Sequence, residues 1–256
     1  MVRIMGIVNL TPDSFWAPSR SDIHNSIPRI ASLVADGADI IDLGAVSTRP
    51  GAADVSVDEE WGRLEPTLKL LSDKAVVEEY GLTGVDFSID TTSSEIVKRS
   101  FDTFGPFIVN DISAGEDDAE MLDVVASLKL PYVAMHKRGN PRTMDSKCEY
   151  EGGVIHALVD YFMDFERRAG EIGIGDWILD PGLGFAKTEA QNWEILEKLE
   201  AFKPLHREIL IGAADKRFTH GDTEKANRMA VAHGAGILRV HDVKAAVGYK
   251  TQSPTI

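Results

Sequence analysis

The chain has 256 residues, of which 43% are hydrophobic and 27% are charged, and its net charge is −14. This excess of acid argues against binding to the phosphate backbone of nucleic acids, which needs a basic surface. No apolar run approaches the ~18 residues of a membrane helix. We therefore expect one domain over residues 1–256, without a nucleic acid or membrane partner. We also expect a cytoplasmic location, because the first residues lack signal-peptide features and Cys148 is the single cysteine.

Eight apolar runs recur along the chain, and each stops at a polar residue followed by turn-forming residues. They occupy residues 3–10, 39–45, 86–90, 107–112, 131–136, 177–180, 208–212 and 236–243. Continuous apolar runs are typical of parallel strands that are covered on both faces. Between them, helical spacing extends over residues 23–35, 59–80, 94–104, 119–128, 154–171 and 190–202, with a short helix within 223–233.

This alternation of strand and helix predicts an α/β protein, a single-domain (β/α)8 TIM barrel. A doubly wound open sheet also alternates strand and helix. The first strand, however, is not followed by a Gly-x-Gly-x-x-Gly turn, and eight units fit a barrel. Both features favour the barrel.

Polar residues stand at the ends of nearly all the predicted strands. They are Asn9, Asp42, Asp90, Asn110, Asp111, His136, Asp180, Lys216, Arg239 and His241. Parallel strands of a barrel place their carboxyl ends on one rim, so these side chains are predicted to surround a single cleft. The alternative is that each residue caps a helix or closes a turn.

Two groups of these residues suggest different ligands. Strand alternation puts Arg239 and His241 on one side, and with Asn9 they would bind phosphate or pyrophosphate. The alternative is an ion pair of Arg239 with Asp42 or Asp242.

Asp90, Asn110 and Asp180 are rich in acceptors and suit a neutral heterocycle that presents N–H donors along one edge. A glycosidase carboxylate pair or a metal site uses the same residue types. No histidines are spaced as ligands of a transition metal, whereas magnesium bound to phosphate needs only one or two protein oxygens.

Seven segments of the sequence, in order, resemble the dihydropteroate synthase family of folate biosynthesis. They are Met5-Gly-Ile-Val-Asn-Leu-Thr-Pro-Asp-Ser-Phe15, Ser47-Thr-Arg-Pro-Gly51, Ser88-Ile-Asp-Thr91, Asn110-Asp-Ile-Ser113, Met135-His136 with Gly139 and Pro141, Asp180-Pro-Gly182 through Lys187-Thr188, and Arg239-Val-His-Asp-Val243. Together they span almost the whole chain.

The resemblance implies a transferase in which p-aminobenzoate displaces pyrophosphate from 6-hydroxymethyl-7,8-dihydropterin pyrophosphate, giving 7,8-dihydropteroate. It implies a Mg²⁺ cofactor with Asn9 as metal ligand, a homodimer, and a target for sulfonamides. Catalytic roles are implied for Asp90, Asp180, Lys216 and Arg239. Substrate-binding roles are implied for Asn110, Met135, Phe185, Thr48, Arg49, Pro50, Asp13, Phe15 and His241.

Two departures from the family pattern raise the question of full activity. Ala214-Asp215-Lys216 stands where the family usually shows Ser-Arg-Lys, and the segment from Lys216 to Arg239 is shorter than in the family. We expect a gap in the ring of helices that exposes apolar surface on strands seven and eight, unless a partner subunit covers it or residues are missing. The alternatives are a pterin-binding homologue without synthase turnover and a pterin-dependent methyltransferase.

Overall fold

Eight parallel strands form one sheet in the computed structural model, which describes residues 1–11, 23–46, 55–139 and 143–251. They are β1 (Arg3–Asn9), β2 (Ile40–Gly44), β3 (Asp86–Asp90), β4 (Ile108–Asp111), β5 (Tyr132–Met135), β6 (Trp177–Asp180), β7 (Leu210–Ile211) and β8 (Ile237–Val240). Their order is β6-β5-β4-β3-β2-β1-β8-β7. A parallel bridge between Leu179 and Ile209 joins the two end strands, so the sheet closes into a barrel.

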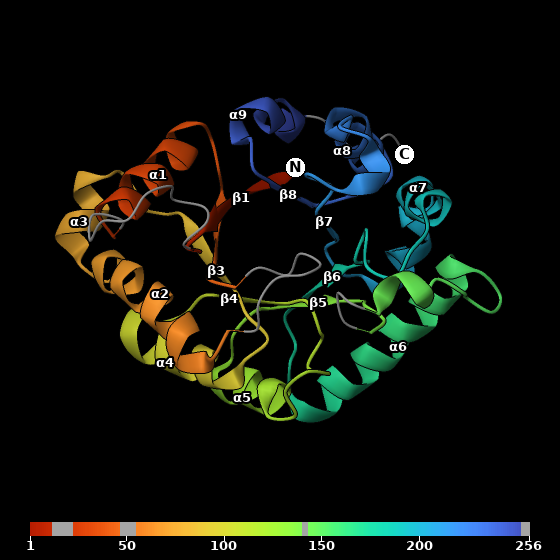
Figure 1. The fold of residues 1–256 in the computed structure, drawn as a ribbon, viewed down its shortest axis with the longest axis horizontal. Helices are drawn as coiled ribbons and strands as arrows, with labels where there is room; N and C mark the ends of the chain where they lie inside the picture. The colour runs from red at the N-terminus through yellow and green to blue at the C-terminus, as the bar shows by residue number, and fades with distance from the viewer. Residues whose placement is uncertain (12–22, 47–54, 140–142, 252–256) are drawn as a thin grey trace.

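Helices encircle the barrel (Figure 1). They are α1 (Ile23–Ala35), α2 (Val57–Leu71), α3 (Lys74–Glu79), α4 (Ser94–Phe104), α5 (Met121–Leu128), α6 (Val154–Ile172), α7 (Glu189–Glu197), α8 (Thr223–Ala232) and α9 (Val243–Ala246). Short 3₁₀ helices cover Met144–Ser146, Leu199–Leu205, Arg217–Thr219 and Val247–Thr251. The predicted (β/α)8 barrel is confirmed. Within the described ranges, no helix has the length and apolar character needed to cross a bilayer.

The elements differ from the sequence prediction at three places. The helix expected over residues 59–80 is two helices, because Asp73 accepts a hydrogen bond from the Ala75 N–H and caps α3. The helix expected over 190–202 ends at Glu197 and continues as a 3₁₀ helix. Strand β8 ends at Val240, so His241 lies beyond the strand.

Alternation along the strands divides the barrel interior into two layers. The lower layer is apolar and takes one buried side chain from each of seven strands: Met5, Ile40, Ile108, Val133, Ile178, Leu210 and Ile237. Successive residues of a strand point to opposite faces, so positions two residues further on point inward again. In five of these strands those positions are Asp42, Asn110, Met135, Asp180 and Arg239. The upper layer of the barrel is therefore mostly polar.

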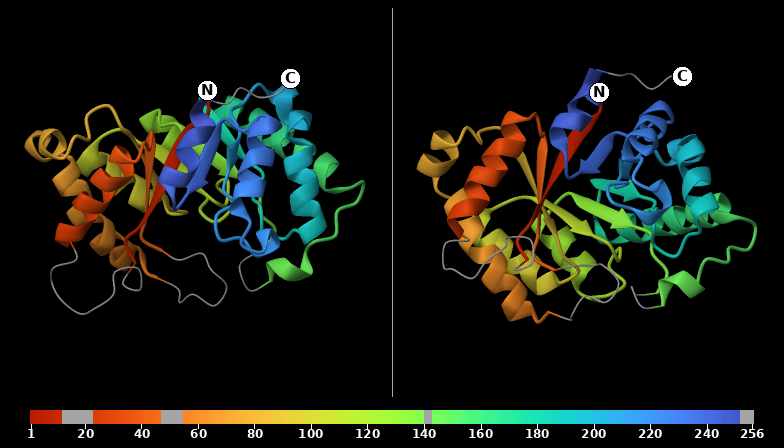
Figure 2. Two further views of the ribbon diagram at one scale, coloured as in Figure 1. Left: turned by 90° about the horizontal axis from the view of Figure 1, so that it is seen from above. Right: turned by 45° about the horizontal axis from the view of Figure 1, so that its top comes forward.

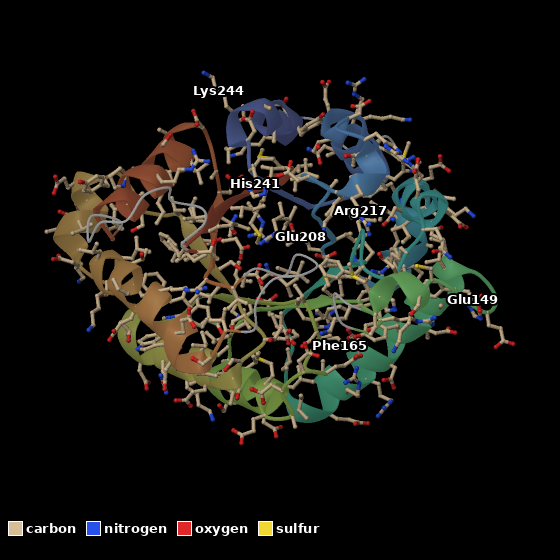
Figure 3. The ribbon with its side chains drawn as sticks, viewed as in Figure 1. Glu149, Phe165, Glu208, Arg217, His241 and Lys244 are labelled. Atoms are coloured by element: carbon tan, nitrogen blue, oxygen red, sulfur yellow. The ribbon has the colours of Figure 1, made fainter. Side chains whose placement is uncertain are left out.

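The outer face of the sheet is covered by apolar helix faces. Phe165 of α6 points toward the strands, as Figure 3 shows. Its ring stacks on Tyr132 of β5 at 5.9 Å and meets the Trp177 ring of β6 edge-on at 4.9 Å. These contacts hold α6 against β5 and β6.

The short segment between β7 and β8 still covers the strands. Helix α8 lies on the same flank as α7, and α9 lies beside β8 and β1 (Figures 1 and 2). All the apolar side chains of β7 and β8 are buried, namely Leu210, Ile211, Ile237, Leu238 and Val240. The expected exposure of apolar strand surface is therefore wrong. A groove with a volume of about 580 Å³ lies between α8 and the segment from α9 to Tyr249.

We expect Ile237→Ala to lower the free energy of unfolding by about 2–5 kcal/mol, because Ile237 is fully buried in the lower layer and the change leaves a cavity. Urea unfolding monitored by circular dichroism measures this. Val247→Ala, at a residue that is 36% exposed, is the control and should cost less than about 0.5 kcal/mol. Equal losses of unfolding free energy in the two variants would contradict the place of Ile237 in the buried lower layer.

Candidate active site

A tight turn after β6 carries the first group of site residues. Gly182 has φ of 68°, and a Cβ at this position would lie 2.0 Å from the backbone oxygen of His136. Only glycine allows the turn to lie this close to the end of β5. The Gly182 N–H donates to Asp180 Oδ1 at 2.7 Å, which holds the carboxylate at the end of β6.

Lys216, from the loop after β7, lies beside this turn. Its Nζ is 4.4 Å from the centre of the Phe185 ring, a cation–π contact. Burial lowers the pKa of Lys216 to about 8, although the Asp180 carboxylate opposes the shift. Burial likewise raises the pKa of Asp180, against the Gly182 N–H and the Lys216 charge. The sequence placed these three residues at one site, and the structure brings them together.

Arg239 lies between two carboxylates at the centre of the upper layer. Its Nε donates to Asp42 Oδ2 at 2.7 Å, and its Nη2 donates to Asp90 Oδ2 at 2.8 Å. Burial acts to lower the pKa of Arg239, but the two carboxylates raise it above its usual value. Burial raises the pKa of Asp90 to about 7. Arg239 opposes this increase, and the negative charge of Asp42 adds to it. The ion pair with Asp42, the alternative from sequence, is present.

Asp42 also holds Asn110, a contact that the sequence did not predict. It is fully buried, and Asn110 Nδ2 donates to both of its oxygens at 3.2 Å. With the amide nitrogen directed to Asp42, the carbonyl oxygen of Asn110 is directed away from it. The signal in the sequence was the position of Asp42, two residues after Ile40 on the inward face of β2.

Two other polar residues at strand ends have structural contacts. Asp111 accepts hydrogen bonds from Tyr132 Oη at 2.6 Å, from the Ser113 N–H and hydroxyl, and from the Gly115 N–H. His136 is buried with its ring against the Tyr161 ring edge at 4.8 Å. For these two residues the alternative of a turn or packing role is the correct one.

Acidic side chains lie beside the residues of the predicted anion-binding group. A Cβ added to Gly44 would lie 3.8 Å from both Asn9 Oδ1 and Asp90 Oδ2. Asn9 is therefore close to Asp90. His241 lies past the end of β8, at the inner edge of the helical ring in Figure 3. Its Nε2 is 3.5 Å from Asp215 Oδ2. Arg239 therefore pairs with acids, and His241 has an acid beside it.

The described part of the chain contains no group of three or more His, Cys, Asp or Glu side chains that could hold a metal ion. A single amide oxygen at the end of β1 fits a magnesium ion that takes most of its ligands from phosphate and water. Met135 is buried beneath the turn, with its Cγ 3.2 Å from the Cβ position of Gly182. Asp13, Phe15, Thr48, Arg49 and Pro50 lie outside the described residues.

Asp90 should make stability depend on pH. Its folded-state pKa of about 7 exceeds the ordinary value of 3.8, so between these values the folded protein holds a proton that the unfolded chain has lost. This contribution therefore falls as the pH rises from about 4 to about 7. Asp90→Asn removes it, so the variant should gain stability relative to the unmodified protein over this window. Urea unfolding across the range tests this, with exposed Asp160→Asn as control; parallel curves would contradict it.

The sequence comparisons place this chain among enzymes that bind pterins. The family model described as "Pterin binding enzyme" matches residues 5–241. The dihydropteroate synthase of Synechocystis is 37% identical over 261 residues, which cover 94% of this chain and 86% of that protein. The chain spans only about a third to a half of several longer folate-synthesis relatives.

Solved structures agree with the sequence comparisons. The Clostridium difficile dihydropteroate synthase, solved in the presence of pteroic acid, has a TM-score of 0.86 and 29% identity, over 97% of this chain and 94% of that one. The Xanthomonas albilineans enzyme with 4-aminobenzoic acid has a TM-score of 0.83 and 31% identity, over 96% and 90%. The chain therefore belongs to the family of pterin-binding enzymes and, within it, to the dihydropteroate synthases.

Proposed function

We propose that the protein condenses p-aminobenzoate with 6-hydroxymethyl-7,8-dihydropterin pyrophosphate, giving 7,8-dihydropteroate and pyrophosphate. The observation that carries the proposal is the polar upper layer of the barrel, where the charges of Lys216 and Arg239 act on Asp180 and where Asp42 holds Asn110. Relatives that are named dihydropteroate synthase support the same reaction, and this chain covers most of their length.

The pterin would bind along its N–H edge. The Asp180 carboxylate and the Asn110 carbonyl oxygen are acceptors, and Asp42 fixes the orientation of the Asn110 amide. Lys216 would donate to the carbonyl side of the ring, and the Phe185 ring provides an apolar surface beside it. Charged acceptors and donors in a buried site discriminate strongly against ligands that lack the matching group.

The chemistry is a substitution at the pterin methylene carbon. The aminobenzoate nitrogen forms a bond to this carbon, and the bond from carbon to the pyrophosphate oxygen breaks with its electron pair on that oxygen. The amine loses one proton, which leaves with the pyrophosphate. Arg239, His241 and Asn9 would bind the leaving pyrophosphate. Fixed positive groups at the place where negative charge develops are the protein's main means of accelerating such a step.

Magnesium is part of the proposal, with Asn9 as its protein ligand. The ion would neutralise charge on the diphosphate oxygens. Thr48, Arg49 and Pro50 are assigned to the aminobenzoate, with Asp13 and Phe15 on a closing loop. The homodimer, the cytoplasmic location and the lack of nucleic acid and membrane partners stay predictions.

A second candidate function is pterin binding without turnover. It is favoured by one observation, the Asp215 carboxylate beside His241, because a negative charge at this point opposes a bound diphosphate. Asp215 has φ of 57°, and its side chain is 71% exposed. Water screens such a charge, so its effect on binding should stay below about 1 kcal/mol.

Calorimetric titration with the pterin pyrophosphate and magnesium, followed by p-aminobenzoate and an assay of released pyrophosphate, tests the proposal. Binding with release is the expected outcome. Asp180→Asn should weaken pterin binding about 10- to 100-fold, because it removes a charged acceptor worth about 1.5–3 kcal/mol; exposed Asp160→Asn is the control. Binding without release would establish the second candidate, and no binding would mean that the acids at the strand ends are structural.

Removing the acid beside His241 should improve the reaction. We expect Asp215→Asn to lower the KM for pterin pyrophosphate by up to about fivefold, since an exposed charge contributes about 1 kcal/mol or less. Asparagine tolerates the left-handed backbone at this position. The combined change Ala214→Ser and Asp215→Arg should raise the turnover number above that of the unmodified protein. Steady-state kinetics at low and high salt measure both, and an unchanged KM at low salt would show that Asp215 does not act on the diphosphate.

A further inference from the structure

A buried lysine closes the turn that carries Asp180 and Phe185. Lys187 is 8% exposed, and its Nζ donates to the backbone oxygens of Gly182 at 3.0 Å and Phe185 at 2.9 Å. The same nitrogen lies 3.0 Å from His136 Nδ1 and 3.4 Å from the His136 backbone oxygen. One ammonium group therefore joins both ends of the turn to the end of β5.

Two other side chains also bind the backbone of the turn. Asn192 of α7 accepts from the Gly184 N–H at 2.7 Å and donates to the Lys187 and Thr188 backbone oxygens. Tyr150 donates from its hydroxyl to the Ala186 backbone oxygen at 2.9 Å. Each of these bonds acts on one part of the turn, and the Phe185 N–H donates to the Gly182 backbone oxygen at 3.1 Å. Lys187 adds to these bonds a link from both Gly182 and Phe185 to the end of β5.

The proton of this pair belongs to the lysine. Burial lowers the pKa of Lys187 to about 7, and the Asp180 carboxylate opposes the shift. Burial, together with the Lys187 charge, lowers the pKa of His136 to about 2, so this ring is neutral and its Nδ1 accepts from Lys187. The acceptors around Nζ compensate for a buried charge that is costly when unpaired.

We propose that Lys187 is a positioning residue for the pterin, which fixes the Asp180 carboxylate and the Phe185 ring in their binding geometry without touching the substrate. The substrate assignment rests on the proposed function. Displacement of a binding group by about 1 Å is enough to reduce a reaction strongly. Loss of Lys187 should therefore affect the pterin more than the aminobenzoate.

Hydrogen exchange tests the positioning directly and does not depend on activity. In Lys187→Met, which keeps an unbranched side chain one atom shorter and removes the charge, amides of residues 182–186 should exchange at least about tenfold faster. Leu199→Ala is the matched control. Leu199 is fully buried at the start of the 3₁₀ helix that follows α7, so the change lowers global stability. It should speed exchange of amides 182–186 no more than the loss of global stability does. Unchanged exchange in Lys187→Met would overturn the proposal, even if the protein proved to have no synthase activity.

Kinetics separate positioning from general loss of stability. Lys187→Met should raise the KM for pterin pyrophosphate about tenfold and change the KM for p-aminobenzoate less than twofold, whereas Leu199→Ala should shift neither. In Lys187→Ala, added propylammonium should restore part of the pterin affinity, and tetramethylammonium, which has no N–H donor, should not. Equal changes in the two KM values, or equal rescue by both cations, would contradict the proposal. A parent protein without turnover would instead refute the proposed function.

Discussion

The barrel mouth depends on one guanidinium group between two carboxylates. Arg239 reaches Asp42 at 2.7 Å and Asp90 at 2.8 Å, and Asp42 also holds Asn110. Charges removed from water are tolerated only when they are paired and hydrogen-bonded. Without Arg239, the two carboxylates would repel each other across the centre of the upper layer. Strands β2, β3, β4 and β8 are thus tied together by polar contacts in the upper layer.

This pairing also limits what Arg239 can do for a ligand. Part of its charge is already balanced by two acids, so its attraction for an incoming diphosphate is weaker than that of an unpaired arginine. The raised pKa of Asp90 partly compensates, because a protonated Asp90 leaves Arg239 with a single negative partner. Binding of an anion and protonation of Asp90 are therefore expected to favour each other, since each reduces the negative charge around the same guanidinium.

The sequence was sufficient for the barrel and for the rim on which the site lies, because both follow from the period of two along a strand and from the common direction of parallel strands. It left the acidic partner of Arg239 open between Asp42 and Asp242. The pairing of Arg239 with Asp42 joins residues 197 positions apart and depends on the register of β1, β2 and β8. His241 was misplaced for a local reason, since β8 ends at Val240, three residues before the end of the predicted run over 236–243.

The four aspartates at strand ends show why residue type alone does not define a binding group. Asp111 directs its oxygens to its own turn and to Tyr132, and Asp42 directs both of its oxygens to Asn110 and one to Arg239. Asp180 accepts from Gly182 through Oδ1 and lies in the electrostatic field of Lys216. A carboxylate whose oxygens are all held by the fold stabilises the barrel, and one that retains an oxygen toward the mouth is suited to a ligand. Asp90 meets the same criterion, because Arg239 binds its Oδ2. Asp180 and Asp90 are therefore the acids suited to a ligand, and the turn that Lys187 holds carries one of them.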